Sequence, residues 1–93
     1  MPLVFLDFDD VICLNNPYGG YDVMRAAYEE PPDLWHRLFH ASSVHVLCAI
    51  LNEHAPRVVI TSSWVRFLDR RAMEAVLKRA GLEAVKAALH EAW

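Results

Sequence analysis

The sequence predicts an α/β domain in which a short parallel sheet is flanked by helices. Residues 3–8 form an apolar run that leads into acids, and residues 57–64 hold a β-branched run that ends in small polar residues. A long segment with helical character separates these two runs. A strand, a helical crossover and a second strand form a right-handed unit with parallel strands. We therefore expect the carboxyl ends of both strands at one edge of the sheet.

The length and composition indicate one folded domain, residues 1–93. The chain is 55% hydrophobic and 23% charged, which excludes a disordered protein. A net charge of −3 argues against a nucleic-acid partner bound by bulk charge, although not against a single phosphate held in a small site. The sequence has no apolar run near the roughly 20 residues of a membrane helix and no basic segment of a signal peptide, so we expect a cytoplasmic protein.

The first strand and the segment after it have distinct signals. Residues 3–8 are almost continuously apolar, which predicts that helices cover both faces of this strand. Residues 11–21 contain the turn signals Asn-Pro and Gly-Gly and are expected to form a flap or short hairpin over the end of the strand. Residues 22–30 fit a short helix, which Pro31 and Pro32 end.

Two more helices are predicted before the second strand. Asp33 is a candidate N-cap for the first of them. Ser42 or Ser43 is expected to cap the second, which Pro56 closes.

A single helix is predicted directly after the second strand. Ser63 is its expected cap and Gly81 its stop, and helical spacing continues to Trp93. The buried stripe of this helix is expected to consist of Val65, Leu68, Ala72, Met73, Val76 and Ala80.

Polar side chains follow both predicted strands. Asp7 and Asp9 are one position apart, so their side chains point to the same side of the sheet. Thr61 and Ser62 are expected to face them across the shared edge. Charged groups in such a place need compensation, and a divalent cation that prefers oxygen ligands, usually Mg²⁺, would provide it. Asp10 is interpreted as an acid that caps a turn or helix.

The segment Asp7-Phe8-Asp9-Asp10-Val11 after an apolar strand, with Val59-Ile60-Thr61-Ser62-Ser63-Trp64 at the end of another, resembles the haloacid dehalogenase-like (HAD) superfamily of phosphohydrolases. The Thr-Ser-Ser-Trp ending is similar to small HAD proteins grouped with nucleic-acid-repair phosphatases. The resemblance implies an incomplete Rossmann-like, HAD-type fold.

The resemblance also implies roles for individual residues. Asp7 would be the nucleophile that forms an aspartyl-phosphate, and Asp9 would be the general acid and then the base. Thr61 would hold the transferring phosphoryl group, with Ser62 as the alternative if the strand ends one residue later. Arg66 either faces a phosphate or is solvated on the surface. Mg²⁺ would be bound by Asp7 and Asp9, with the carbonyl of Asp9 as the ligand.

The chain departs from the superfamily pattern in two respects. HAD phosphatases need a Lys or Arg near the nucleophile, whereas Lys78 and Lys86 both lie in helical stretches. They also need an acidic pair after a later strand, and no acid after Thr61 follows an apolar strand run. We therefore expect the N-terminal half of a HAD-like domain, truncated or degenerate. Three functions stay open: a Mg²⁺-dependent phosphohydrolase acting on a small phosphorylated substrate, a catalytically inactive oligomerisation or partner-binding module, and a nucleic-acid end-processing phosphatase. The Ser63-Trp64 similarity suggests the third, whereas the net charge does not favour it.

A sheet of two strands predicts association with another chain. It leaves unpaired strand edges and an apolar face, and so narrow a sheet is marginal by itself. We expect a homodimer or a higher oligomer, formed by strand addition or by exchange of the C-terminal helix.

The cysteines and histidines have simpler interpretations. Cys13 and Cys48 have no metal or redox motif around them and are expected to be buried thiols. His36 and His40 are one helical turn apart, but no third zinc ligand has suitable spacing, so exposed or capping roles are favoured.

Overall fold

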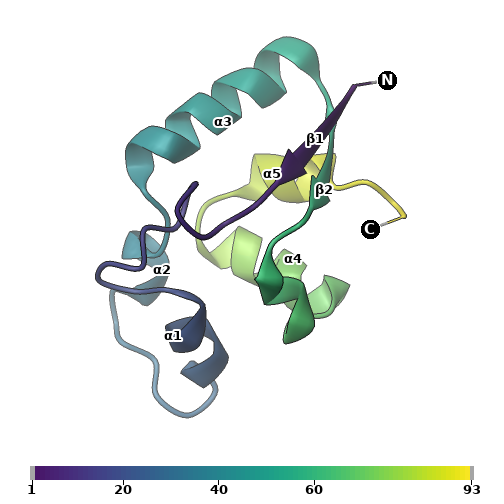
Figure 1. Cartoon of the computed structure of the whole chain (residues 1–93). Helices are drawn as coiled ribbons and strands as arrows, with labels where there is room; N and C mark the ends of the chain where they lie inside the picture. The colour runs from purple at the N-terminus through teal and green to yellow at the C-terminus, as the bar shows by residue number, and fades with distance from the viewer. Residues whose placement is uncertain (1, 93) are drawn as a thin grey trace.

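The computed structural model describes residues 2–92 and has the predicted α/β architecture (Figure 1). Within these residues, β1 (Leu3–Leu6) and β2 (Arg57–Ile60) form a two-stranded parallel sheet. Leu3 lies opposite Arg57, and Leu6 lies opposite Ile60. The parallel pairing predicted from the sequence is confirmed, and the carboxyl ends of both strands lie at one edge.

The helices follow the predicted order with shorter bounds. They are α1 (Gly20–Arg25), α2 (Leu34–Arg37), α3 (Ala41–His54), the 3₁₀ turn η1 (Ser63–Arg66), α4 (Arg70–Arg79) and α5 (Glu83–Ala88). The long helix α3 is the crossover between the strands, and α5 packs against α3, α4 and β2 (Figure 1). Among the described residues, no helix is long and apolar enough to cross a membrane.

The start of α3 differs from the prediction. His40 occupies its N-cap position, so Ser42 and Ser43 lie inside the helix and neither caps it. The helix ends before Ala55, whose φ of 46° lies in the left-handed region that stops helices.

The single helix predicted after β2 is divided in two. The Oγ atom of Ser62, and not that of Ser63, accepts a hydrogen bond from the backbone N–H of Trp64 at 3.2 Å and begins η1. Asp69 then accepts a hydrogen bond from the N–H of Ala72 at 2.8 Å and begins α4. Each cap starts a new helix because it satisfies N–H groups that have no partner within the helix.

The structure contradicts one part of the prediction for residues 63–81 and confirms another. Val65 is 42% exposed, because the division of the helix takes it off the buried stripe. Gly81 adopts a φ of 80° after α4, which confirms the predicted stop. The predicted role of Trp93 lies outside the described residues.

The sheet is covered on one face. Leu6, Val58 and Ile60 are buried, whereas Leu3 is 48% exposed and Phe5 is 68% exposed. The prediction that helices cover both faces of the first strand is therefore wrong. An apolar run shows that a strand avoids charge, but it does not show what lies against each face.

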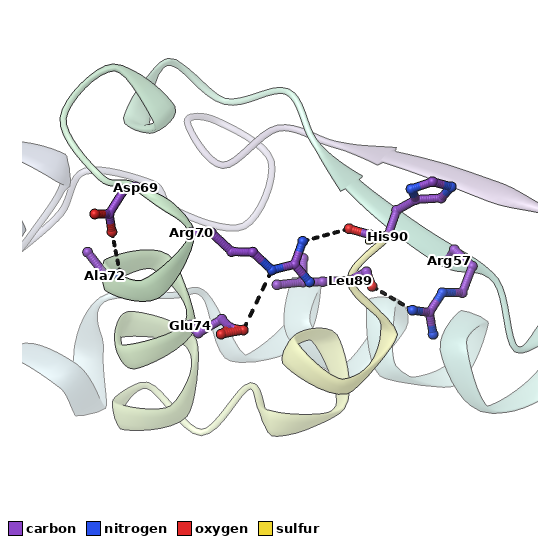
Figure 2. Close-up of polar contacts among 7 residues, drawn as sticks. All are labelled: Arg57, Asp69, Arg70, Ala72, Glu74, Leu89 and His90. Carbon is purple, nitrogen blue, oxygen red and sulfur yellow. Dashed lines mark hydrogen bonds and ion pairs between the residues drawn. The ribbon is translucent and has the colours of Figure 1, made fainter. Parts of the chain in front are cut away.

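The outer edge of β2 is sealed by the segment that follows α5 (Figure 2). Leu89 forms a parallel bridge with Val58, and the N–H of His90 donates to the Val58 carbonyl at 2.8 Å. Two guanidinium groups hold the same segment: Arg57 donates to the Leu89 carbonyl and Arg70 to the His90 carbonyl, each at 2.7 Å. The edge of β2 is thus closed by the chain itself.

Candidate active site

The polar residues after the two strands meet at one edge of the sheet. The N–H of Thr61 donates to the carbonyl of Leu6 at 2.8 Å, which continues the parallel pairing one residue beyond β2. Asp7 and Thr61 directly follow the paired residues Leu6 and Ile60, and both are exposed. The structure therefore places the carboxylate and the hydroxyl on a common rim.

The chain turns sharply after Asp7. The Oδ1 atom of Asp7 accepts a hydrogen bond from the Phe8 N–H at 2.8 Å. The Phe8 carbonyl then accepts hydrogen bonds from the three successive N–H groups of residues 11–13. Asp10 lies in this turn with a φ of 63°, a conformation that Asp and Asn tolerate better than most residues. Asp10 is thus a turn residue, and Asp7 has one oxygen engaged by the backbone.

Asp9 is half-buried, and one of its oxygens is held from two sides. Its Oδ1 atom accepts a hydrogen bond from the indole Nε1–H of Trp64 at 3.3 Å and another from the Nδ2–H of Asn15 at 3.3 Å. The first of these bonds ties the β1 end to the segment after β2. No pattern in the sequence predicts this hydrogen bond, because Asp9 and Trp64 are 55 positions apart.

Trp64 is held firmly in the core. It is 1% exposed, and its ring meets the Phe8 ring edge-on with centroids 4.8 Å apart. The Phe39 ring stacks on it at 5.8 Å. A buried indole N–H needs an acceptor, and Asp9 provides it.

The other two candidate residues differ in exposure. Ser62 is completely buried, and its hydroxyl oxygen is the acceptor that caps η1. Thr61, in contrast, is exposed at this edge. Arg66 is exposed at the last position of η1 and not in the first turn of an α-helix, as the sequence had suggested, because residues 63–66 form a 3₁₀ turn.

The available metal ligands define the kind of ion that could bind. Among the described residues, no group of three or more His, Cys, Asp or Glu side chains could hold a metal ion. Mg²⁺ does not need such a cage, since it commonly binds one or two carboxylates together with waters and a substrate phosphate. The exposed carboxylate of Asp7 and the backbone carbonyl of Asp9 are oxygen ligands that would fit this shared kind of site.

The fold and the rim of acidic and hydroxyl groups define a HAD-like α/β domain. A family model described as the HAD domain in Swiss Army Knife RNA repair proteins matches residues 3–91. The match spans nearly the whole chain, and the chain belongs to this family. No curated protein and no solved structure matches it.

Proposed function

We propose that this HAD-like domain is a phosphohydrolase that cleaves phosphomonoesters through an aspartyl-phosphate on Asp7. The observation that supports the proposal is the shared rim, where the hydrogen bond from Thr61 N–H to the Leu6 carbonyl holds the two exposed side chains at the same edge. Phosphoryl transfer depends mainly on positioning and on electrostatic stabilisation, and a rim of this kind can provide both.

In the first step, Asp7 attacks the substrate phosphorus. Because Oδ1 of Asp7 is engaged by the Phe8 N–H, Oδ2 is the attacking atom. The bond between phosphorus and the leaving oxygen breaks, and its electron pair stays on that oxygen. The leaving oxygen takes the proton of the Asp9 carboxyl group. The Thr61 hydroxyl donates a hydrogen bond to a phosphoryl oxygen.

In the second step, water releases the phosphate. The Asp9 carboxylate takes a proton from water as the water oxygen attacks phosphorus. The bond between phosphorus and Asp7 breaks, and its electron pair returns to the Asp7 carboxylate. Inorganic phosphate leaves, and Asp9 is protonated again. Mg²⁺ held by the Asp7 carboxylate and the Asp9 carbonyl would supply positive charge that offsets the repulsion between a carboxylate and a phosphate.

The substrate class follows from the family and the charge taken together. The family description names RNA repair proteins, which favours a phosphorylated RNA end as substrate over a free small phosphate. The net charge of −3 does not favour a long electrostatic footprint on RNA. A site that grips one terminal phosphate satisfies both observations. Faster hydrolysis of a terminally phosphorylated oligonucleotide than of an aryl phosphate would support RNA ends, and the opposite order would support small substrates.

The test of the enzymatic proposal is hydrolysis of an aryl phosphate with and without Mg²⁺. Asp7→Asn is expected to lower kcat/KM by at least about a thousandfold, because it removes the nucleophile. Asp10→Asn is the matched control, since it makes the same change at an exposed acid in the same turn, at a φ that Asn tolerates. Equal turnover by wild type and Asp7→Asn would refute the proposal.

The open edge of β1 favours a second candidate function, a module that pairs two copies of the chain. The carbonyls of Pro2 and Leu6 accept hydrogen bonds from β2, so the backbone groups of Leu3 and Phe5 point to the other side. The four residues of β1 carry no charge and no proline that would discourage strand addition.

Antiparallel pairing of two β1 strands fits this edge. Leu3 of one copy would face Phe5 of the other on both sides of a two-fold axis at Val4. This arrangement keeps the acidic ends of the two β1 strands apart. Since the edge of β2 is sealed by residues 89–90, pairing would stop at two chains (Figure 2).

Light scattering at micromolar concentration tests the pairing. The wild type is expected to be a dimer and Phe5→Lys a monomer with an unchanged circular dichroism spectrum. Tyr28→Lys is the control, because Tyr28 is a 91% exposed aromatic residue outside the sheet, and this variant should remain a dimer. A wild-type monomer would contradict the module. A dimer in which Asp7→Asn changes neither Mg²⁺ binding nor turnover would favour the module over the enzyme.

A further inference from the structure

We infer that Asn15 and Trp64 are positioning residues that fix Asp9 so that its Oδ2 atom carries the catalytic proton. The contact itself is structural, and its catalytic meaning rests on the proposed function. Oδ1 of Asp9 accepts two N–H donors, each at 3.3 Å. A proton on Oδ1 would point at one of these donor hydrogens, whereas Oδ2 has no such conflict. The general acid is thus oriented before substrate binds.

The Gly19-Gly20 pair is explained by the same two donors. A Cβ atom on Gly19 would lie 1.9 Å from the side-chain oxygen of Asn15. A Cβ atom on Gly20 would lie 2.8 Å from Nε1 of Trp64. A side chain at either glycine would therefore displace one of the two groups that hold Asp9. Because Gly19 and Gly20 have no side chains, the start of α1 can pack closely against Asn15 and Trp64, the two residues that orient Asp9.

The two donors are held in different ways. Trp64 packs in the core against the Phe8 and Phe39 rings, which also contact each other. Asn15 has a φ of 58°, a left-handed conformation that Asn adopts more readily than most residues. A donor held in the core and a second donor from the exposed Asn15 together restrict the rotation of the Asp9 carboxyl. Such support from neighbouring residues is what a proton donor needs for accurate alignment.

The expected signature is a dependence on the leaving group. An alkoxide is a poor leaving group and needs the proton from Asp9, whereas an aryl oxide leaves readily without much help. Loss of alignment should therefore slow the hydrolysis of an alkyl phosphate more than that of an aryl phosphate. A purely structural role would slow both equally.

The test compares Trp64→Phe and Asn15→Asp with wild type. Trp64→Phe keeps an aromatic ring and removes the N–H, and Asn15→Asp keeps the side-chain shape and tolerates the same φ. We expect kcat/KM for glycerol phosphate to fall about tenfold in each variant, and kcat/KM for 4-nitrophenyl phosphate to fall less than about threefold. Asn16→Asp makes the same charge change one residue further along and should leave both values unchanged. Equal losses on the two substrates, or no loss, would overturn the positioning role.

A second measurement separates this inference from the proposed function. The indole N–H resonance of Trp64 should shift, and its exchange with solvent should accelerate, in Asp9→Ala. An unchanged resonance would remove the contact on which the inference rests, even if the enzyme is active. A wild type that hydrolyses neither phosphate with Mg²⁺ present would overturn the proposed function and the catalytic part of the inference, whatever the resonance does.

Discussion

The segments that follow β1 and β2 end at the same edge but differ in what they expose. After β1, Asp7 and Asp10 are exposed. After β2, Ser62 and Trp64 are buried, and Thr61 is exposed at the rim. The first segment supplies acidic groups and the second supplies a rigid support for them. We therefore expect substitutions of the exposed acids after β1 to change chemistry with little change in stability, and substitutions of the buried residues after β2 to change stability first.

The largest expected difference in stability is between Trp64→Ala and Asp7→Asn. Removal of a buried Trp side chain typically lowers the free energy of unfolding by about 3–5 kcal/mol, a large fraction of the stability of a small domain. Asp7→Asn changes an exposed side chain and keeps the Oδ1 acceptor for Phe8 N–H, so its effect should be within about 0.5 kcal/mol. Urea denaturation measures both. Comparable losses in the two variants would contradict the division between the segments.

A finer comparison uses two adjacent hydroxyls. Thr61→Val should lower kcat/KM by up to about a hundredfold with little effect on stability, because its hydroxyl is exposed at the rim. Ser62→Ala should lower the free energy of unfolding by about 1 kcal/mol and leave most activity, because it removes the cap of η1. Phosphatase activity and urea denaturation, measured for both Thr61→Val and Ser62→Ala, check these expectations. The reverse pattern would place the phosphate contact at Ser62.

The smallest expected effect concerns Tyr18, in the segment between β1 and α1. The Tyr18 hydroxyl donates a hydrogen bond to Asp33, which lowers the pKa of Asp33 below its ordinary 3.8 and raises the pKa of Tyr18 above its ordinary 10.0. A carboxyl group with a lowered pKa stabilises the fold above its ordinary value, and this contribution is lost as the pH falls through the lowered pKa.

Tyr18→Phe removes this hydrogen bond. The variant should be less stable than wild type near neutral pH, and the difference should shrink below pH 3.8. Urea denaturation across this pH range checks the effect. Tyr28→Phe, at a 91% exposed position, is the control and should show no such trend. If the difference in stability between wild type and Tyr18→Phe were constant with pH, the hydrogen bond from Tyr18 to Asp33 would not be the cause of that difference.

The sequence predicted the features that depend on local pattern. The β-branched run at residues 57–60 and the apolar run before Asp7 predicted two strands, and the helical crossover predicted that they are parallel. The parallel pairing of the two strands in turn predicted that Asp7 and Thr61 lie at one edge of the sheet. The family followed from the same two segments.

The features that the sequence did not predict depend on distant contacts. The hydrogen bonds of Asp9 connect it with Asn15, 6 positions away, and with Trp64, 55 positions away. No rule of sequence spacing predicts either contact. The exposed face of β1 could not be distinguished from a covered one, because Phe5 is apolar in either case. The break between η1 and α4 was missed because the helical spacing of the apolar residues continues across Asp69, the residue that caps α4.

The most direct test of the central claim is to capture the phosphorylated enzyme. Asp9→Asn should accumulate it with an aryl phosphate, because the good leaving group allows the first step while the base for the second step is missing. The reaction is quenched in acid and the digested protein is analysed by mass spectrometry. The account predicts one phosphoryl group on the peptide that contains Asp7. Turnover with no phosphorylated enzyme, or a phosphoryl group on a different residue, would contradict it.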